Sequence, residues 1–102
     1  MATIADSIER LEGLVRERPG FGIRTTTARA TLTDTLGCTV DDGHDVIVAD
    51  LGRAFGGEGA APSPSSLLRA AFASCMAMSY RLRAERAGID LTSVVVTVET
   101  DS

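Results

Sequence analysis

The sequence predicts a single α+β domain in which an antiparallel β-meander precedes one long, buried central helix. Three observations predict this fold class. Residues 22–50 contain threonine-rich, strand-like segments and a hairpin signal. Residues 70–80 carry no charge, and they lie between residues that start and stop helices. Residues 92–100, TSVVVTVET, have the clearest strand pattern in the chain.

Composition narrows the classes of function. A chain of 102 residues with 44% hydrophobic residues is one globular domain, but with three Phe, one Tyr and no Trp its core must be aliphatic. Cores of this size are often completed by a partner chain. A net charge of -4 without a basic cluster argues against nucleic acid as a partner. With neither a membrane-spanning run nor a signal-peptide pattern, we expect a cytoplasmic protein whose two cysteines stay reduced.

Residues 1–20 are predicted to form a helical arm. Thr3 can cap the helix, and Pro19-Gly20 ends it. Apolar side chains recur on one face, so the helix should lie against a sheet or a partner, with a solvated arm as the alternative. This face consists of Ile4, Ile8, Leu11 and Val15.

The meander occupies residues 22–50. Asp41-Asp42-Gly43 is a hairpin signal between its second and third strands, and Asp50 ends the third. Residues 53–61 then read as a loop, which leads to the central helix. The expected strands are residues 22–33, 38–40 and 45–49.

The central helix is predicted over residues 63–88. Ser63 suits the N-cap, Pro64 suits the first helical position, and Gly88 suits the stop. Because residues 70–80 are uncharged, this part should be buried nearly all round. Four strands and one helix would leave much apolar surface uncovered, so we expect another chain to cover it, or this sequence to be the front part of a larger domain.

Cys75, in the middle of the central helix, is the best candidate for chemistry. The competing interpretation is an inert, small apolar side chain. Cys75 lies about three turns from the helix start, where the helix dipole has faded, so a thiolate there needs a nearby cation. The candidate cations are Arg24, Arg29, Arg53 and Arg69.

The other reactive residue types carry weaker signals. Cys38 lies in a short strand and is expected to be structural, although a Cys38–Cys75 redox pair is an alternative. His44 is the only histidine, so we expect neither a metal site nor a Cys-His pair, and no cofactor is indicated. The run Gly56-Gly57-Glu58-Gly59 lacks the Lys-Ser/Thr of a phosphate-binding loop.

Residues 22–102 resemble the OsmC/Ohr family, the osmotically inducible protein C and organic hydroperoxide resistance proteins. The family pattern combines a Gly-Gly loop, two prolines one residue apart, and a long helix with an Ala-small-Cys core. A Val-rich strand follows after Gly88-Ile89. The matching residues are Asp50, Gly56-Gly57, Ala61-Pro62-Ser63-Pro64, Leu67-Leu68, Ala70-Ala71 and Ala73-Ser74-Cys75.

The resemblance implies an intertwined homodimer with active sites at the dimer interface. In active members a cysteine, matched here by Cys75, reduces organic hydroperoxides and becomes a sulfenic acid. A second cysteine on a second central helix resolves it, an arginine and a glutamate assist, and lipoylated proteins or other dithiols supply the reductant. This chain stops before that second helix, and Ser65 and Ser66 stand where relatives carry glutamate.

The function expected from this resemblance is thiol-dependent reduction of organic hydroperoxides, in defence against oxidative stress. Cys75 is the expected peroxidatic residue, and Arg24 or Arg29 could reach it from the first strand. The alternative is a shortened, non-catalytic family member. Such a protein would bind another chain, perhaps one that completes the fold, or hold a hydrophobic small molecule in an apolar pocket around Cys75.

Overall fold

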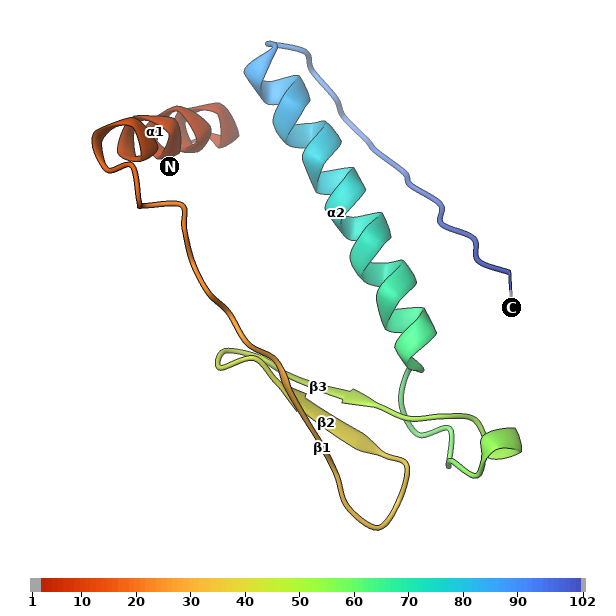
Figure 1. Cartoon of the computed structure of the whole chain (residues 1–102). Coiled ribbons are helices and arrows are strands. Elements are labelled where there is room, and N and C mark those ends of the chain that lie inside the picture. Colours follow the sequence, from red (N-terminus) through yellow and green to blue (C-terminus); the bar gives the residue numbers. More distant parts are fainter. Residues whose placement is uncertain (1–2, 102) are drawn as a thin grey trace. The chain divides into compact units, whose positions relative to one another are not determined.

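The computed structural model describes residues 3–101 and confirms the α+β fold class. The chain divides into two compact units. Residues 25–71 make up one, and the segments on either side of them make up the other. Helix α2 begins in the first unit and continues in the second (Figure 1). The elements are α1 (Ile4–Glu17), β1 (Arg29–Leu32), β2 (Cys38–Asp41), β3 (Val46–Ala49), the short 3-10 helix η1 (Arg53–Phe55) and α2 (Pro64–Arg86).

The three strands form the predicted antiparallel meander, in the order β1-β2-β3. The hairpin between β2 and β3 is confirmed: Asp41 pairs with Val46, and Asp42 Oδ1 accepts the N–H groups of His44 and Asp45 at 2.9 and 2.7 Å. The first strand is shorter than the predicted residues 22–33. Arg29 pairs with Asp41, where β2 ends, so the residues before Arg29 have no neighbour in the ladder.

Helix α1 forms as predicted, because its first turn closes in a capping box. The Asp6 N–H donates to Thr3 Oγ1 at 3.1 Å, and the Thr3 N–H donates to Asp6 Oδ2 at 3.2 Å. No residue of α1 is buried, and its apolar face, including Leu11 and Val15, is largely exposed. The face predicted to lie against a sheet or a partner is therefore left open.

Helix α2 also begins and ends at the predicted signals. Ser63 Oγ accepts the N–H of Ser66 at 3.2 Å, and Pro64 opens the helix. At the other end Gly88 has a φ of 72°. Its N–H donates to the Glu85 carbonyl at 3.3 Å, and the Ile89 N–H donates to the Ala84 carbonyl at 2.8 Å. This pair of bonds is a Schellman motif, and it requires a residue that accepts positive φ.

The predicted burial of residues 70–80 is wrong for this chain alone. Within α2 only Ala84 is buried, and Phe72 is 58% exposed. In the described part of the chain, the buried apolar residues are Ala49 and Ala84. A charge-free helix is covered only where other elements present apolar faces to it. Here Leu68, Phe72, Met78 and Leu82 all remain exposed.

The predicted strand over residues 92–100 is also wrong: this segment runs on from α2 without forming a strand (Figure 1). The expected alternation is nevertheless present. Val94, Val96 and Val98 are half-buried, whereas Val95 is 86% exposed. A strand needs a hydrogen-bonded neighbour as well as the right side chains, and within residues 3–101 the sheet consists of β1, β2 and β3. The segment therefore has the side-chain alternation of a strand, with Val94, Val96 and Val98 on its more buried side, but not the hydrogen bonds of one.

Among residues 3–101, neither α-helix combines the length and the hydrophobicity needed to cross a lipid bilayer.

Candidate functional site

Cys75 lies on α2 with an exposed, unbridged thiol. Cys38, the first residue of β2, is half-buried and also free. Within the described residues, His, Cys, Asp and Glu side chains do not gather in groups of three that could hold a metal ion. Because Cys75 is exposed and Cys38 is half-buried, Cys75 is the more accessible of the two cysteines to a reagent in solution.

The surroundings of Cys75 on α2 are apolar. Leu68, Phe72, Cys75 and Leu82 are separated by four, three and seven residues, a spacing that puts them on one face of a helix. All four are exposed; Leu68, for example, is 67% exposed. We call this set the Cys75 stripe. A thiol in such a stripe is open to apolar molecules, or to an apolar surface that covers it.

The arginines predicted to assist Cys75 are found in different elements. Arg24 lies in the irregular segment before β1, and Arg29 is the first residue of β1. Neither forms an ion pair with an acidic group in the described chain. That one of them stands beside Cys75 stays a prediction.

Arg69 is the arginine whose position at the start of α2 is clearest. Its Nη2 donates to Ser66 Oγ at 3.3 Å, and the Ser63 hydroxyl donates to the same Ser66 oxygen at 3.2 Å. The resemblance leads us to expect glutamate at position 66. Ser66 instead offers Arg69 a neutral hydroxyl oxygen as the hydrogen-bond acceptor.

The loop that leads into α2 is organised around Asp50, which is 5% exposed. Asp50 Oδ1 accepts the Leu51 N–H at 2.8 Å, and Oδ2 accepts the N–H groups of Ala60 and Glu58 at 3.2 and 3.3 Å. The bond from Ala60 is the main reason why the pKa of Asp50 lies below its ordinary value. Those from Leu51 and Glu58 act in the same sense, and burial opposes them.

Backbone contacts close the same loop. The Asp50 N–H donates to the Pro62 carbonyl at 3.1 Å, and the Gly59 N–H donates to the Leu51 carbonyl at 3.0 Å. Gly57 packs directly against the Leu51 backbone. We call residues 50–62 the entry loop. Sequence reasoning identified Asp50 as the end of a strand and as one of the residues that carry the family resemblance, but not as the organiser of this loop. An aspartate directly before a glycine-rich segment was the available signal, because its carboxylate can accept the N–H groups of a loop without regular structure.

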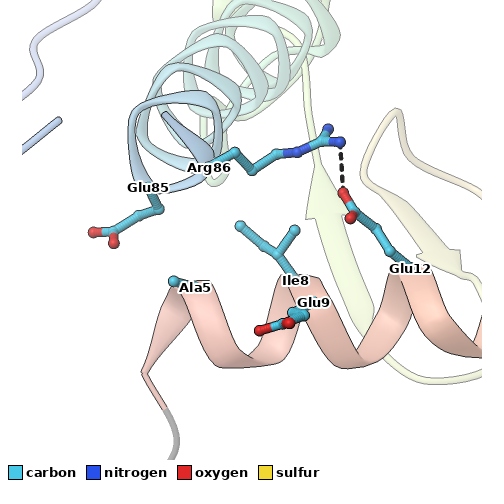
Figure 2. A pocket seen from close by; sticks show the side chains of 6 residues that line it. All are labelled: Ala5, Ile8, Glu9, Glu12, Glu85 and Arg86. Atoms are coloured by element: carbon cyan, nitrogen blue, oxygen red, sulfur yellow. Dashed lines mark ion pairs between the residues drawn. The ribbon is translucent and has the colours of Figure 1, made fainter. Parts of the chain in front are cut away.

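Of the hollows near the end of α2, two are relevant to binding. One of them, between α1 and α2, measures about 390 Å³. An ion pair of 2.5 Å joins Glu12 and Arg86 at this hollow (Figure 2). Both side chains are substantially exposed, so this pair contributes little to stability. The other hollow is apolar, measures about 490 Å³, and is lined by Tyr80, Arg83, Ala84, Ala87, Ile89, Leu91, Ser93 and Val94. Cys75 lines neither of them.

Comparison with known proteins finds a similarity to a protein family in the second half of the chain. Residues 57–102 match the sequence model of a family described as OsmC-like protein. The predicted resemblance is confirmed over this segment, which contains α2, Cys75 and most of the glycine-rich part of the entry loop. Residues 22–56, for which the resemblance was also predicted, lie outside the match. No curated protein and no solved structure matches the chain.

Proposed function

We propose that this chain, with its OsmC-like segment, reduces organic hydroperoxides through the thiol of Cys75. The observation that carries the proposal is the position of Cys75: an exposed thiol in an apolar helical stripe, inside the segment that matches the family. An apolar surround favours an organic hydroperoxide, whose alkyl group can lie on Phe72 and Leu68, over hydrogen peroxide.

The chemistry requires the Cys75 thiol in its thiolate form, the hydroperoxide and a reductant. The Cys75 thiolate attacks the outer oxygen of the hydroperoxide; an S–O bond forms and the O–O bond breaks. The sulfur is oxidised by two electrons to a sulfenic acid, and the hydroperoxide is reduced to an alkoxide that takes a proton to become the alcohol. A dithiol, such as a dihydrolipoyl group, attacks the sulfenic sulfur with loss of water. The second thiol of the reductant then attacks this mixed disulfide, which releases the Cys75 thiolate and the reductant in its disulfide form.

We propose further that two copies of the chain, or this chain and a complementing one, form the working unit. The support is the uncovered apolar surface: the Cys75 stripe, the apolar face of α1, and the alternating segment of residues 92–100 that has no strand neighbour. Exposed apolar faces on three separate elements are typical of a chain that is covered by a partner. In such an assembly Arg24 or Arg29 would supply the cation for the thiolate, in a cytoplasm that keeps thiols reduced.

The test is mass spectrometry of the intact protein after a small excess of cumene hydroperoxide, with dimedone present to trap sulfenic acid. We expect a dimedone adduct on Cys75. Cys75→Ser should abolish it, whereas Cys38→Ser should leave it in place. Loss of the adduct in both variants would indicate a Cys38–Cys75 redox pair instead. A wild-type protein that consumes no hydroperoxide and forms no adduct would refute the proposed reaction.

A second candidate function is binding without catalysis. The apolar hollow of about 490 Å³ beside Tyr80 and Val94 favours it, because this hollow can hold an apolar side chain or small molecule and does not involve Cys75. One experiment distinguishes the binding function from the catalytic function. Binding of a fluorescent apolar probe that Ala84→Glu abolishes and Cys75→Ser does not, together with no hydroperoxide consumption, would support the binding function.

A further inference from the structure

We propose that Asp50 is a positioning residue: its carboxylate fixes the entry loop, and through the loop the first turn of the helix that carries Cys75. The part about the loop and the helix start rests on geometry alone. The part about Cys75 rests on the proposed function.

The Asp50 carboxylate takes the place of regular structure in this loop. Between β3 and α2 the chain forms only the single turn of η1, so most backbone N–H groups there have no ladder or helix to join (Figure 1). Asp50 supplies acceptors for three of them, at positions one, eight and ten residues further along the chain. A single side chain thereby gathers both ends of the loop.

Only a short carboxylate fits this role. Both oxygens accept N–H groups, so an amide in place of the carboxylate would turn an NH₂ group towards a backbone donor. The carboxylate also lies close to the Gly57 backbone, because a Cβ added to Gly57 would stand 2.8 Å from Asp50 Oδ1. Asp50 is also 5% exposed, so water cannot easily replace it as an acceptor.

The loop connects directly to the helix start. The Asp50 N–H is bonded to the carbonyl of Pro62, two residues before Pro64 begins α2. Ser63, between those two prolines, caps the first turn. Because α2 is continuous from Pro64 to Arg86, its first turn and Cys75 belong to one helix. Loosening Asp50 should therefore disturb the alignment of Cys75 without unfolding the helix around it.

Asp42 offers a matched control. It too is an aspartate whose Oδ1 accepts two backbone N–H groups, from Asp45 and His44, and whose pKa is lowered by those bonds. It holds the β2–β3 turn and makes no bond to the entry loop. Asp42→Asn therefore reproduces the chemical change of Asp50→Asn at a place that does not lead into α2.

The first measurement is amide hydrogen exchange of the full-length protein, followed residue by residue by NMR. In Asp50→Asn we expect the N–H groups of Glu58 and Ala60 to exchange about tenfold faster or more, because their hydrogen bonds to a charged group are lost. The N–H of Leu67, which donates to the Ser63 carbonyl in the first turn of α2, should exchange faster as well if that turn loosens with the loop. In Asp42→Asn these three should exchange as in the wild type. Unchanged exchange at Glu58 and Ala60 in Asp50→Asn would overturn the proposal for the loop. If Asp50→Asn does not fold, Asp50→Ser is measured instead, since it keeps an acceptor for Leu51 alone.

The second measurement separates positioning from mere stability. The rate at which Cys75 reacts with cumene hydroperoxide is divided by its rate with iodoacetamide, which needs only an accessible thiol. We expect this ratio to fall at least threefold in Asp50→Asn and to stay constant in Asp42→Asn. An unchanged ratio would overturn the claim about Cys75. If the wild type does not react with hydroperoxide at all, the proposed function fails and the exchange measurement still decides the role of Asp50.

Discussion

Gly57 and Leu51 approach so closely that a Cβ atom on Gly57 would lie 2.1 Å from the Leu51 carbonyl oxygen. The same atom would stand 2.7 Å from the Leu51 carbonyl carbon, so the obstacle is rigid backbone. We therefore predict that Gly57→Ala forces the entry loop apart and lowers the free energy of unfolding by about 1–3 kcal/mol, the usual cost of overpacking. Urea denaturation at neutral pH measures this change.

Gly52→Ala is the control for that substitution. Gly52 lies in the same loop, has a φ of -69°, and has no atom within 4 Å of an added Cβ. Alanine there should change the free energy of unfolding by less than about 1 kcal/mol, and in the stabilising direction, because it restricts the unfolded chain. Equal effects of Gly52→Ala and Gly57→Ala would show that the close approach to Leu51 does not constrain the loop.

The cap of α2 gives a second prediction. Ser63 Oγ accepts the N–H of Ser66, which would otherwise lack a partner in the first turn. Ser63→Ala should lower stability by about 1 kcal/mol. Ser65→Ala, at an exposed position two residues later, should have an effect of a few tenths of a kcal/mol. Denaturation curves for Ser63→Ala that coincide with the wild type would place the start of the helix elsewhere.

The Asp50 carboxylate should make the free energy of unfolding depend on pH in the acidic range. Its folded-state pKa lies below the ordinary value of 3.8, chiefly because of the hydrogen bond from Ala60. Because the pKa of Asp50 is lower in the folded state, the unfolded chain binds the proton more readily than the folded chain does. The stabilising contribution of Asp50 is therefore complete well above pH 3.8 and is lost as the pH falls through the lower folded-state pKa. We expect unfolding free energies to decline between about pH 5 and pH 2.

Asp50→Asn tests this dependence. The variant should be less stable than the wild type at pH 6, and the difference between the two should shrink as the pH approaches 2, because protonation removes the charge from the wild type as well. A gap between the two proteins that stays constant over this range would contradict the role of Asp50 ionisation. Asp42→Asn provides the comparison for a carboxylate in an exposed turn, whose pKa is lowered chiefly by the N–H of Asp45.

The parts of this structure that could be predicted from sequence are those decided by nearby residues. The Asp42-Gly43 turn and the Ser63-Pro64 and Gly88 ends of α2 each depend on contacts within about five positions. Two predictions, the burial of residues 70–80 and the strand at residues 92–100, were wrong because both features need partners far along the chain or outside it. The role of Asp50 was missed for a similar reason: its bonds to Glu58 and Ala60 span eight and ten residues without any periodic pattern.

The exposed stripe on α2 gives the last prediction, which concerns assembly. Phe72 is 58% exposed beside Cys75, and an aromatic side chain buried in an interface contributes about 2 kcal/mol or more. We expect the wild-type protein to sediment as a dimer or larger species at micromolar concentration. Phe72→Glu should weaken this association roughly 30-fold or more. Ile23→Glu is the matched control, because Ile23 is apolar and 83% exposed but lies in an irregular segment outside the stripe. Sedimentation velocity distinguishes the outcomes: a wild type that remains a folded, cooperatively unfolding monomer would rule out an assembly built on this stripe.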